Sequence, residues 1–370
     1  MAEKVCIVYH DILTAYGHGT ACCMDTLFQN RTKFRKMTRF HSDGEIPAVA
    51  ACFPEELFSG DTQYIAETSV KYLLDQVPAG KEYLSGNAAL FFALTQGEIH
   101  KLDNPEKIWT AQILAKEIQK YLNRDSGFRI FSASCASGNI ALARAAAEIE
   151  AARMDHAIVI GCDVVSEFTY AGFSSVHAIT QTVCRPYDIS HNGLLLGDAA
   201  GIIVLASEKK ARQNNWKILA TVSGYGLTTD SYHAAAPDPE GIQMKNAIKK
   251  VLEKNSGGKL AGVIGHGTGT ALNDNMEIAA LTKIFPQGIP LASVKGGTGH
   301  ILAASGLVQA SCAIECLERG KMFPQTSLQT PQEGAENFVS EEAQSLSGDT
   351  ILSLNAGFGG LNAVIGIRRA

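Results

Sequence analysis

One cysteine stands where a chain commonly exposes a nucleophile. Cys135 follows the apolar stretch 128–131, which predicts a short buried strand, and it precedes the alanine-rich stretch 140–149, which predicts a helix. At such a helix start, the unsatisfied backbone N–H groups and the positive end of the helix dipole favour the thiolate, which is the nucleophilic form. The alternative is that Cys135 is one of nine cysteines that mostly serve as small buried apolar residues.

Two histidines occupy similar places later in the chain. His266 comes directly after a strand predicted over 260–265, and His300 follows a strand predicted over 291–294 and a glycine-rich turn. Each alone is most simply a hydrogen-bonded structural histidine, but glycines beside both leave room for a substrate against the ring. A further predicted strand, 351–356, delivers the loop 357–360, in which glycines flank Phe358 and a backbone N–H group can face a ligand.

The rest of the chain predicts the elements that position these residues. Strands and helices alternate, and the pattern of 132–140 recurs weakly in 293–301, each followed by an apolar helix of small residues. This alternation in two similar halves predicts an α/β fold with mixed sheets covered on both faces. We expect strands at 4–8, 156–161 and 200–205, a strand and glycine turn within 217–226, a turn at 12–19, and helices through 23–28, 61–76 and 108–122.

Length, composition and charge limit the classes of function. The 370 residues, 46% hydrophobic and 19% charged, predict two domains or one duplicated unit. The apolar runs are too short to span a membrane, the first residues show no signal pattern, and the odd number of cysteines indicates a reduced, cytoplasmic protein. A net charge of −5 argues against nucleic-acid binding. Cys312 and Cys316 lie one helical turn apart without a second ligand pair, so we expect helix packing there and no metal site.

Taken together, the motifs resemble those of the β-ketoacyl-acyl carrier protein synthases of the thiolase fold, in the branch with a Cys-His-His triad. Six motifs stand in the family's order from about residue 130 to the end, and His300 is the residue that selects this branch. The matching segments are Ser134–Gly138, Arg185–Asp188, Gly197–Gly201, His266–Thr270 with Asp274 and Glu277, Lys295 with Thr298–His300, and Gly357–Gly360.

The resemblance implies a fold and a set of roles. It implies two duplicated halves, 1–210 and 211–370, in a layered α-β-α-β-α sandwich. Cys135 would carry the acyl group, His266 and His300 would stabilise the enolate of a malonyl thioester, and no cofactor or metal would be needed. The N–H groups of Cys135 and of the loop at Gly357 and Phe358 would bind the oxyanion, and Phe358 would gate the thiol. Lys295 would orient the histidines within a buried charge network that includes Glu277 and Asp274, with a carboxylate as the partner of the lysine.

The resemblance also implies partners. Acyl- and malonyl-phosphopantetheine would arrive on an acidic acyl carrier protein, which must find a local basic patch on a chain that is itself negative. The candidates for that patch are Arg185 and the cluster that contains Arg31, Lys33 and Arg35. A dimer is expected, either of two copies or with a related synthase-like subunit.

Several alternatives stay open. A cysteine hydrolase with Cys135, His266 and an asparagine is possible by spacing, but it would leave His300 idle. A non-catalytic subunit resembling a chain length factor is the other alternative, although such subunits have lost the cysteine that is intact here. Leu361 stands where the family usually has threonine, and residues 80–127 depart from the usual pattern. Acyl chain length, and primary fatty-acid as against polyene or polyketide synthesis, therefore stay undecided.

Overall fold

The computed structural model describes residues 3–40, 48–58, 65–78, 83–84, 88–97, 111–125, 127–255 and 257–370. Ten of its strands follow one hydrogen-bonded order, β12-β11-β15-β16-β10-β1-β9-β7-β5-β6. One set of five is β1 (Val5–Thr14), β5 (Ala89–Ala93), β6 (Phe128–Phe131), β7 (His156–Asp163) and β9 (Ala199–Ser207). The other is β10 (Ala220–Thr229), β11 (Leu260–Ile264), β12 (Leu291–Ala292), β15 (Thr350–Gly357) and β16 (Leu361–Arg369).

The two sets have the same topology. In each, the outer three strands are parallel to one another, and each of the inner two is antiparallel to the strands that it pairs with. They meet at a short antiparallel contact between β1 and β10, where Cys6 faces Thr221. The chain therefore repeats one mixed α/β unit, as the sequence predicted. The boundary predicted at 210/211 falls inside the short helix α6 (Glu208–Gln213).

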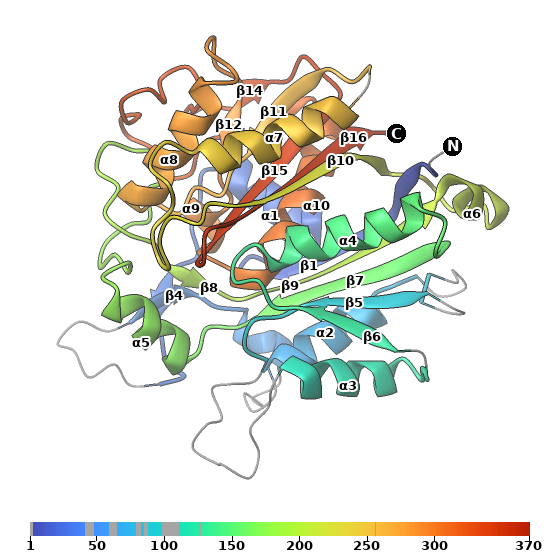
Figure 1. The fold of residues 1–370 in the computed structure, drawn as a ribbon. Helices are drawn as coiled ribbons and strands as arrows, with labels where there is room; N and C mark the ends of the chain where they lie inside the picture. The colour runs from blue at the N-terminus through green and yellow to red at the C-terminus, as the bar shows by residue number, and fades with distance from the viewer. Residues whose placement is uncertain are drawn as a thin grey trace.

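Helices separate and cover the two sets of strands, giving five layers (Figure 1). α4 (Ser137–Glu150) and α10 (Ser305–Arg319) lie between them, with α1 (Thr20–Phe28) beside α10. α2 (Ile65–Asp75) and α3 (Ala111–Tyr121) cover one outer face, and α7 (Ile242–Lys254) and α8 (Ala271–Thr282) cover the other. The remaining elements are β2 (Gly17–His18), β3 (Arg35–Lys36), β4 (Val49–Ala51), α5 (Glu167–Ser175), β8 (Leu196–Gly197), α9 (Lys295–Thr298), β13 (Lys321–Met322) and β14 (Gln344–Ser345).

Small residues let the two central helices approach closely. A Cβ atom on Gly138 of α4 would lie 2.8 Å from the backbone nitrogen of Gly306 of α10. Backbone therefore meets backbone where α4 and α10 begin, and the alanines of α4 extend this close packing along the helix. The crossing brings the segment that carries Cys135 against the segment that follows His300.

Two local predictions were wrong. The turn expected at 12–19 begins later, because β1 runs to Thr14 with both faces buried and pairs with β9 along its length. The glycines expected to end a strand in 217–226 lie inside β10, where α7 crosses so closely that a Cβ on Gly226 would meet the backbone of Ala247. The helix predicted over 61–76 is α2 and that over 108–122 is α3, with 61–64 and 108–110 outside the described residues. No described helix combines the length and apolar character needed to cross a membrane.

Candidate active site

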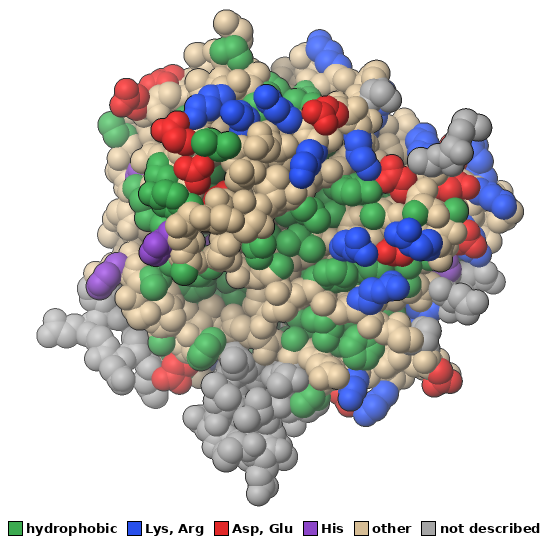
Figure 2. All heavy atoms as spheres, in the orientation of Figure 1, with side chains coloured by type: hydrophobic (Ala, Val, Ile, Leu, Met, Phe, Trp, Pro, Cys, Tyr) green, Lys and Arg blue, Asp and Glu red, His purple; other side chains and the backbone are tan. Residues whose placement is uncertain are grey.

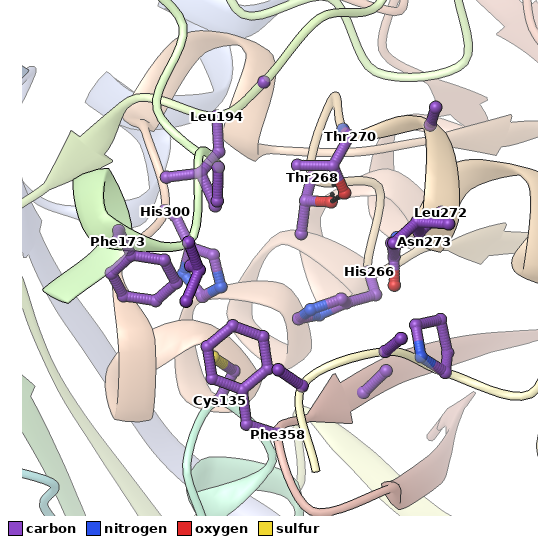
Figure 3. A pocket seen from close by; sticks show the side chains of 18 of the residues that line it. Cys135, Phe173, Leu194, His266, Thr268, Thr270, Leu272, Asn273, His300 and Phe358 are labelled. Atoms are coloured by element: carbon purple, nitrogen blue, oxygen red, sulfur yellow. Dashed lines mark hydrogen bonds between the residues drawn. The ribbon is translucent and has the colours of Figure 1, made fainter. Parts of the chain in front are cut away.

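The turn between β6 and α4 presents Cys135 at the bottom of a cavity (Figure 3). Ser134 adopts a φ of 50°, a left-handed conformation that costs a non-glycine residue of order 1–2 kcal/mol. The hydroxyl of Ser137 offsets this strain, because it donates to the carbonyl of Ser134 at 2.6 Å and accepts the N–H of Ala133 at 2.8 Å. The sequence thus forms a braced turn that points one thiol into the cavity.

The ionisation of Cys135 differs from the expectation. Burial raises the pKa of its thiol to about 12, and the positive charge of Lys295 only partly opposes that rise. The helix start was expected to favour the thiolate, but loss of hydration outweighs it in this enclosed position. The resting group is therefore a thiol, and its proton must leave during any reaction at the sulfur.

His266 stands at the end of β11, where one carboxylate fixes the backbone around it. Glu277 of α8 accepts the N–H of His266 at 2.6 Å and that of Gly267 at 2.8 Å. The hydroxyl of Tyr187 donates to the same carboxylate at 2.9 Å. Glu277 is fully buried, and its pKa is raised by desolvation. Glu277 thus accepts hydrogen bonds from two backbone N–H groups and from the Tyr187 hydroxyl, and these bonds fix the backbone beside His266.

Asp274 does the same for the segment that follows. It accepts the N–H groups of Thr268 at 3.0 Å and Gly269 at 3.3 Å, and that of Tyr187 at 2.9 Å. Nδ1 of His191 lies 3.5 Å from Oδ2 of Asp274, the oxygen that also accepts the N–H of Tyr187. Asp274 and Glu277 together clamp residues 266–269 against the turn at Tyr187.

Lys295 contacts His266 and not a carboxylate. Its ammonium lies 3.1 Å from Nδ1 of His266 and also donates to the carbonyl oxygen of the same residue. Within the described part of the chain, Lys295 makes no ion pair with a carboxylate, contrary to the prediction; Glu277 and Asp274 act on its pKa only through their charges. Desolvation lowers the pKa of this fully buried lysine to about 8.

His300 is held by the turn in which it lies. Gly299 has a φ of 72°, and a Cβ there would lie 2.5 Å from the carbonyl oxygen of Leu196, so only glycine fits. The N–H of Leu302 donates to Nδ1 of His300 at 3.1 Å. The rings of His266 and His300 stand 5.5 Å apart at an interplanar angle of 83°.

These contacts determine which imidazole nitrogens carry protons. Burial, helped by the charge of Lys295, holds the pKa values of His266 and His300 well below 6.5, so both rings are neutral. Each Nδ1 accepts a hydrogen bond, from Lys295 or from Leu302, which leaves the proton on Nε2. Both rings therefore offer an N–H donor to the cavity.

Cys135, His266 and His300 converge in a cavity of about 450 Å³ (Figure 3). The cysteine sulfur and one nitrogen from each ring all lie within 4.8 Å of one another. Of the described residues that line the cavity, none is lysine, arginine, aspartate or glutamate. The cavity thus presents one thiol and two N–H donors in a wall that carries no fixed charge.

Two phenylalanines close the cavity on one side. Phe173 of α5 lies 5.9 Å from the ring of His300 and 5.6 Å from that of Phe358, both measured between ring centroids. The loop of Phe358 rests on the cysteine turn, because a Cβ on Gly357 would lie 3.2 Å from Cβ of Ser134. The sequence identified Phe358 and Gly357 but not Phe173, since α5 has no apolar stripe that would mark a buried face.

Among the described residues, Cys135, His266 and His300 also form a group whose ligand atoms are close enough together to hold a metal ion. Zinc would need a lone pair from each imidazole and a thiolate. Here the inward nitrogen of each ring carries a proton and burial disfavours the thiolate, so the residues fit a negatively charged oxygen better than a cation.

The predicted docking residues lie at the surface around α9. Arg31 and Lys33 are exposed, whereas the guanidinium of Arg35 already donates to the carbonyl of Phe53 at 2.6 Å. Arg185 is half-buried and lies 3.4 Å from the hydroxyl of Ser190. A Cβ on Gly296 would touch Pro186 and one on Gly297 would touch the backbone of Arg31, so both candidates border the same short helix. Arg39, from the same basic stretch, instead binds the buried carboxylate of Asp198 with both terminal nitrogens.

Two family models match the chain. The model described as "Beta-ketoacyl synthase, N-terminal domain" matches residues 105–211, and "Beta-ketoacyl synthase, C-terminal domain" matches residues 219–329. Together they cover more than half of the chain and include every residue of the triad.

Named relatives agree with these models. A putative mitochondrial 3-oxoacyl-[acyl-carrier-protein] synthase of Schizosaccharomyces pombe is 29% identical over 68% of this chain and 65% of its own length. A 3-oxoacyl-[acyl-carrier-protein] synthase 2 of Staphylococcus aureus is 31% identical over 63% of this chain and 60% of its own. The chain thus spans less than two thirds of either relative. A solved structure titled "The ishigamide ketosynthase/chain length factor" superposes with a TM-score of 0.90 over all of both chains at 23% identity, which shows the same fold.

Proposed function

The chain belongs to the β-ketoacyl synthase family, and we propose that it condenses malonyl-acyl carrier protein with an acyl group held as a thioester on Cys135. The observation that carries the proposal is the convergence of one thiol with two N–H donors in an uncharged cavity. It would be an acyltransferase that acts in chain elongation, of fatty acids or of polyenes and polyketides.

The first step transfers the acyl group to the enzyme. Sγ of Cys135 attacks the acyl carbon of a carrier-bound thioester, the bond from that carbon to the carrier's sulfur breaks, and the thiol proton ends on the leaving sulfur. The backbone N–H groups of Cys135 and Phe358 bind the oxyanion that forms in between. The elevated pKa of the thiol makes this transfer of the proton part of the step, since the resting sulfur is not ionised.

The second step uses the two histidines. Malonyl carrier protein enters, loses carbon dioxide and becomes an enolate whose negative oxygen accepts hydrogen bonds from Nε2–H of His266 and of His300. The enolate carbon attacks the acyl carbon on Cys135, the C–S bond breaks, and the released thiolate takes up a proton from solvent. Each donor aimed at such an oxyanion is worth about 2.7–4 kcal/mol in the transition state.

The geometry opposes a cysteine hydrolase. In that reaction an asparagine would orient the histidine through the nitrogen that faces away from the cysteine. Here Nδ1 of His266 contacts Lys295, and the amide of Asn273 contacts Asp274 at 3.2 Å instead. A non-catalytic subunit is disfavoured because Cys135, His266 and His300 are all present and converge.

We propose an acyl carrier protein as the partner that delivers both substrates. The names of the two relatives specify an acyl carrier protein. Its acidic surface would meet Arg185 on one side of α9 and Arg31, Lys33 and Arg35 on the other.

A second subunit would pair at the free sheet edge. Among the described strands, β6 is hydrogen-bonded on one side only, to β5, and an exposed strand edge is a template for pairing with another chain. Apolar side chains gather across the face shown in Figure 2, over the region where Figure 1 places α4. A second copy or a related subunit fits there, and the similar structure's title names a chain length factor beside its ketosynthase.

We propose a cytoplasmic location, because all nine cysteines are free thiols. We also propose that the two halves, 1–210 and 211–370, are the domains of the chain.

Mass spectrometry of the intact protein tests the function. Incubation with acyl carrier protein that bears an acyl chain should add one acyl mass at Cys135, and later addition of malonyl carrier protein should remove it and yield a β-ketoacyl carrier. A series of chain lengths would also identify the preferred acyl group. Hydrolysis of the acyl adduct without a condensed product would instead support the hydrolase.

A further inference from the structure

We propose that Gln309 is a positioning residue that holds the cysteine turn and the His266 strand in register through a buried amide network. The network consists of the side chains of Asn139, Gln309, Ser353 and Asn355, each with no exposed surface. Gln309 is not among the residues that line the cavity, so it acts only through others. The kinetic part of the inference rests on the proposed condensation.

The first branch of the network reaches His266. Nε2 of Gln309, on α10, donates to the carbonyl oxygen of Gly265 at 2.7 Å and to that of Leu354 at 3.3 Å. Gly265 immediately precedes His266 at the end of β11. The amide therefore ties the strand end that presents His266 both to α10 and to β15.

The second branch reaches the helix that carries Cys135. The hydroxyl of Ser353 donates to Oε1 of Gln309 at 3.1 Å, and Nδ2 of Asn139 donates to that hydroxyl at 3.2 Å. The same Nδ2 lies 3.0 Å from the carbonyl oxygen of Ser353 and 3.2 Å from that of Ala363. Asn139 is four residues beyond Cys135, so a chain of four polar groups connects the nucleophile's helix to the histidine's strand.

The third branch reaches the loop of Phe358. Nδ2 of Asn355 donates to Oε1 of Gln309 at 2.7 Å, and Asn355 lies two residues before Gly357. One buried amide thus contacts the strand end before His266 and the strand that leads to the oxyanion loop, and it reaches the helix of Cys135 through Ser353. Because hydrogen bonds are directional where apolar packing is not, this network specifies one relative orientation of the three elements.

Misplacement should therefore affect the step that needs the three elements together. In condensation, an enolate bound to His266 must reach the acyl carbon on Cys135, and an error of 1 Å in such a geometry can reduce a rate about 10²-fold. Acyl loading needs only the thiol and the oxyanion donors, and the loop of Phe358 contacts the cysteine turn directly through Ser134, without the amide network. We expect Gln309→Met to lower kcat for condensation about 10- to 100-fold, with KM and the loading rate changed by less than about 3-fold.

Two further variants calibrate this result. Thr350→Val, at the other end of β15, removes a fully buried hydroxyl that contacts Asn255 and Asp349, so it matches the loss of buried hydrogen bonds without touching the network. Ser353→Ala breaks only the link between Gln309 and Asn139, and its small change keeps the test valid if Gln309→Met does not fold. Gln309→Glu keeps the acceptor for Ser353 and Asn355 but removes the donor to Gly265 and Leu354, so it should not recover the lost rate.

Hydrogen–deuterium exchange provides a readout that does not depend on activity. Gln309→Met and Ser353→Ala should speed exchange in peptides that contain 136–140, and Gln309→Met also in those that contain 263–267, whereas Thr350→Val should not. The inference is overturned if loading and condensation fall equally, or if Thr350→Val with a similar loss of thermal stability gives the same kinetic and exchange changes. If the wild-type protein does not condense substrates, the proposed function fails, and the exchange experiment alone decides the network.

Discussion

Replacing His300 with alanine should separate the two half-reactions. The substitution removes the Nε2–H donor that Leu302 fixes by occupying Nδ1, while Cys135 and the oxyanion N–H groups remain. A donor to a developing oxyanion is worth about 10²–10³-fold in rate. Decarboxylation of malonyl carrier protein should therefore fall by that factor, and acyl loading should fall less than about 10-fold.

The assay follows each half-reaction by itself. Release of labelled carbon dioxide reports decarboxylation, and intact mass reports the acyl adduct. His300→Gln should recover part of the decarboxylation rate, because an amide N–H can replace an imidazole donor but cannot act as a base at neutral pH. His156→Ala is the control, since it removes another buried imidazole, which meets the ring of Trp216 in an edge-to-face contact at the far end of β7.

Equal losses in loading and decarboxylation would refute this reasoning, since they would mean that His300 activates the thiol or holds the fold. Failure of His300→Gln to recover any activity, when the protein is folded, would argue for proton transfer by the imidazole in place of hydrogen bonding to the enolate.

Three other changes have definite outcomes. Cys135→Ala should abolish the acyl adduct in intact mass spectra with little change in thermal stability, because one small buried side chain replaces another, and a persisting adduct would move the nucleophile elsewhere. Desolvation lowers the pKa of Lys295 to about 8, so the rate of condensation should decline as pH rises through about 8. The lysine of the unfolded chain keeps its proton to about pH 10.5, so the unfolding free energy of the wild type, relative to that of Lys295→Met, should rise between pH 8 and 10.5 by on the order of 3 kcal/mol. A difference that stays constant with pH in urea titrations would contradict this. Reversal of charge at Arg185, or at Lys33 with Arg35, should raise KM for carrier-bound substrate more at low salt than at high salt and leave turnover of an acyl-pantetheine unchanged; equal effects on both substrates would exclude these residues from docking.

The positions of the reacting residues could be predicted from the sequence because each is a local feature. A strand, a turn and a helix of small residues place Cys135, and a strand end places His266, but the roles proposed for these residues came from the resemblance of six motifs to a family. The same patterns gave the repeated α/β unit. The ends of elements were less predictable: β1 continues through an expected turn because β9 pairs with it, and that partner is about 190 residues away in the chain.

The electrostatic details depend on contacts that no local pattern contains. A buried lysine usually needs a carboxylate, yet Lys295 uses a ring nitrogen and a carbonyl oxygen, both of His266. A helix start usually favours a thiolate, but the depth of Cys135 below the surface reverses that preference. Phe173 and Gln309 escaped notice for the same reason, since each acquires its role only when segments distant in the chain meet.

The charge of Lys295 connects these details. Its charge acts to lower the pKa values of Cys135, His266 and His300. One buried ammonium therefore makes the thiol of Cys135 easier to ionise than burial alone would leave it, and it keeps both imidazole rings neutral. Desolvation lowers its own pKa, and the negative groups around it oppose that shift only in part. An enolate or oxyanion in the cavity would add negative charge, so Lys295 should be most strongly stabilised when the reaction reaches its charged intermediates. Such a site binds the transition state better than the ground state, which is the requirement for a catalyst.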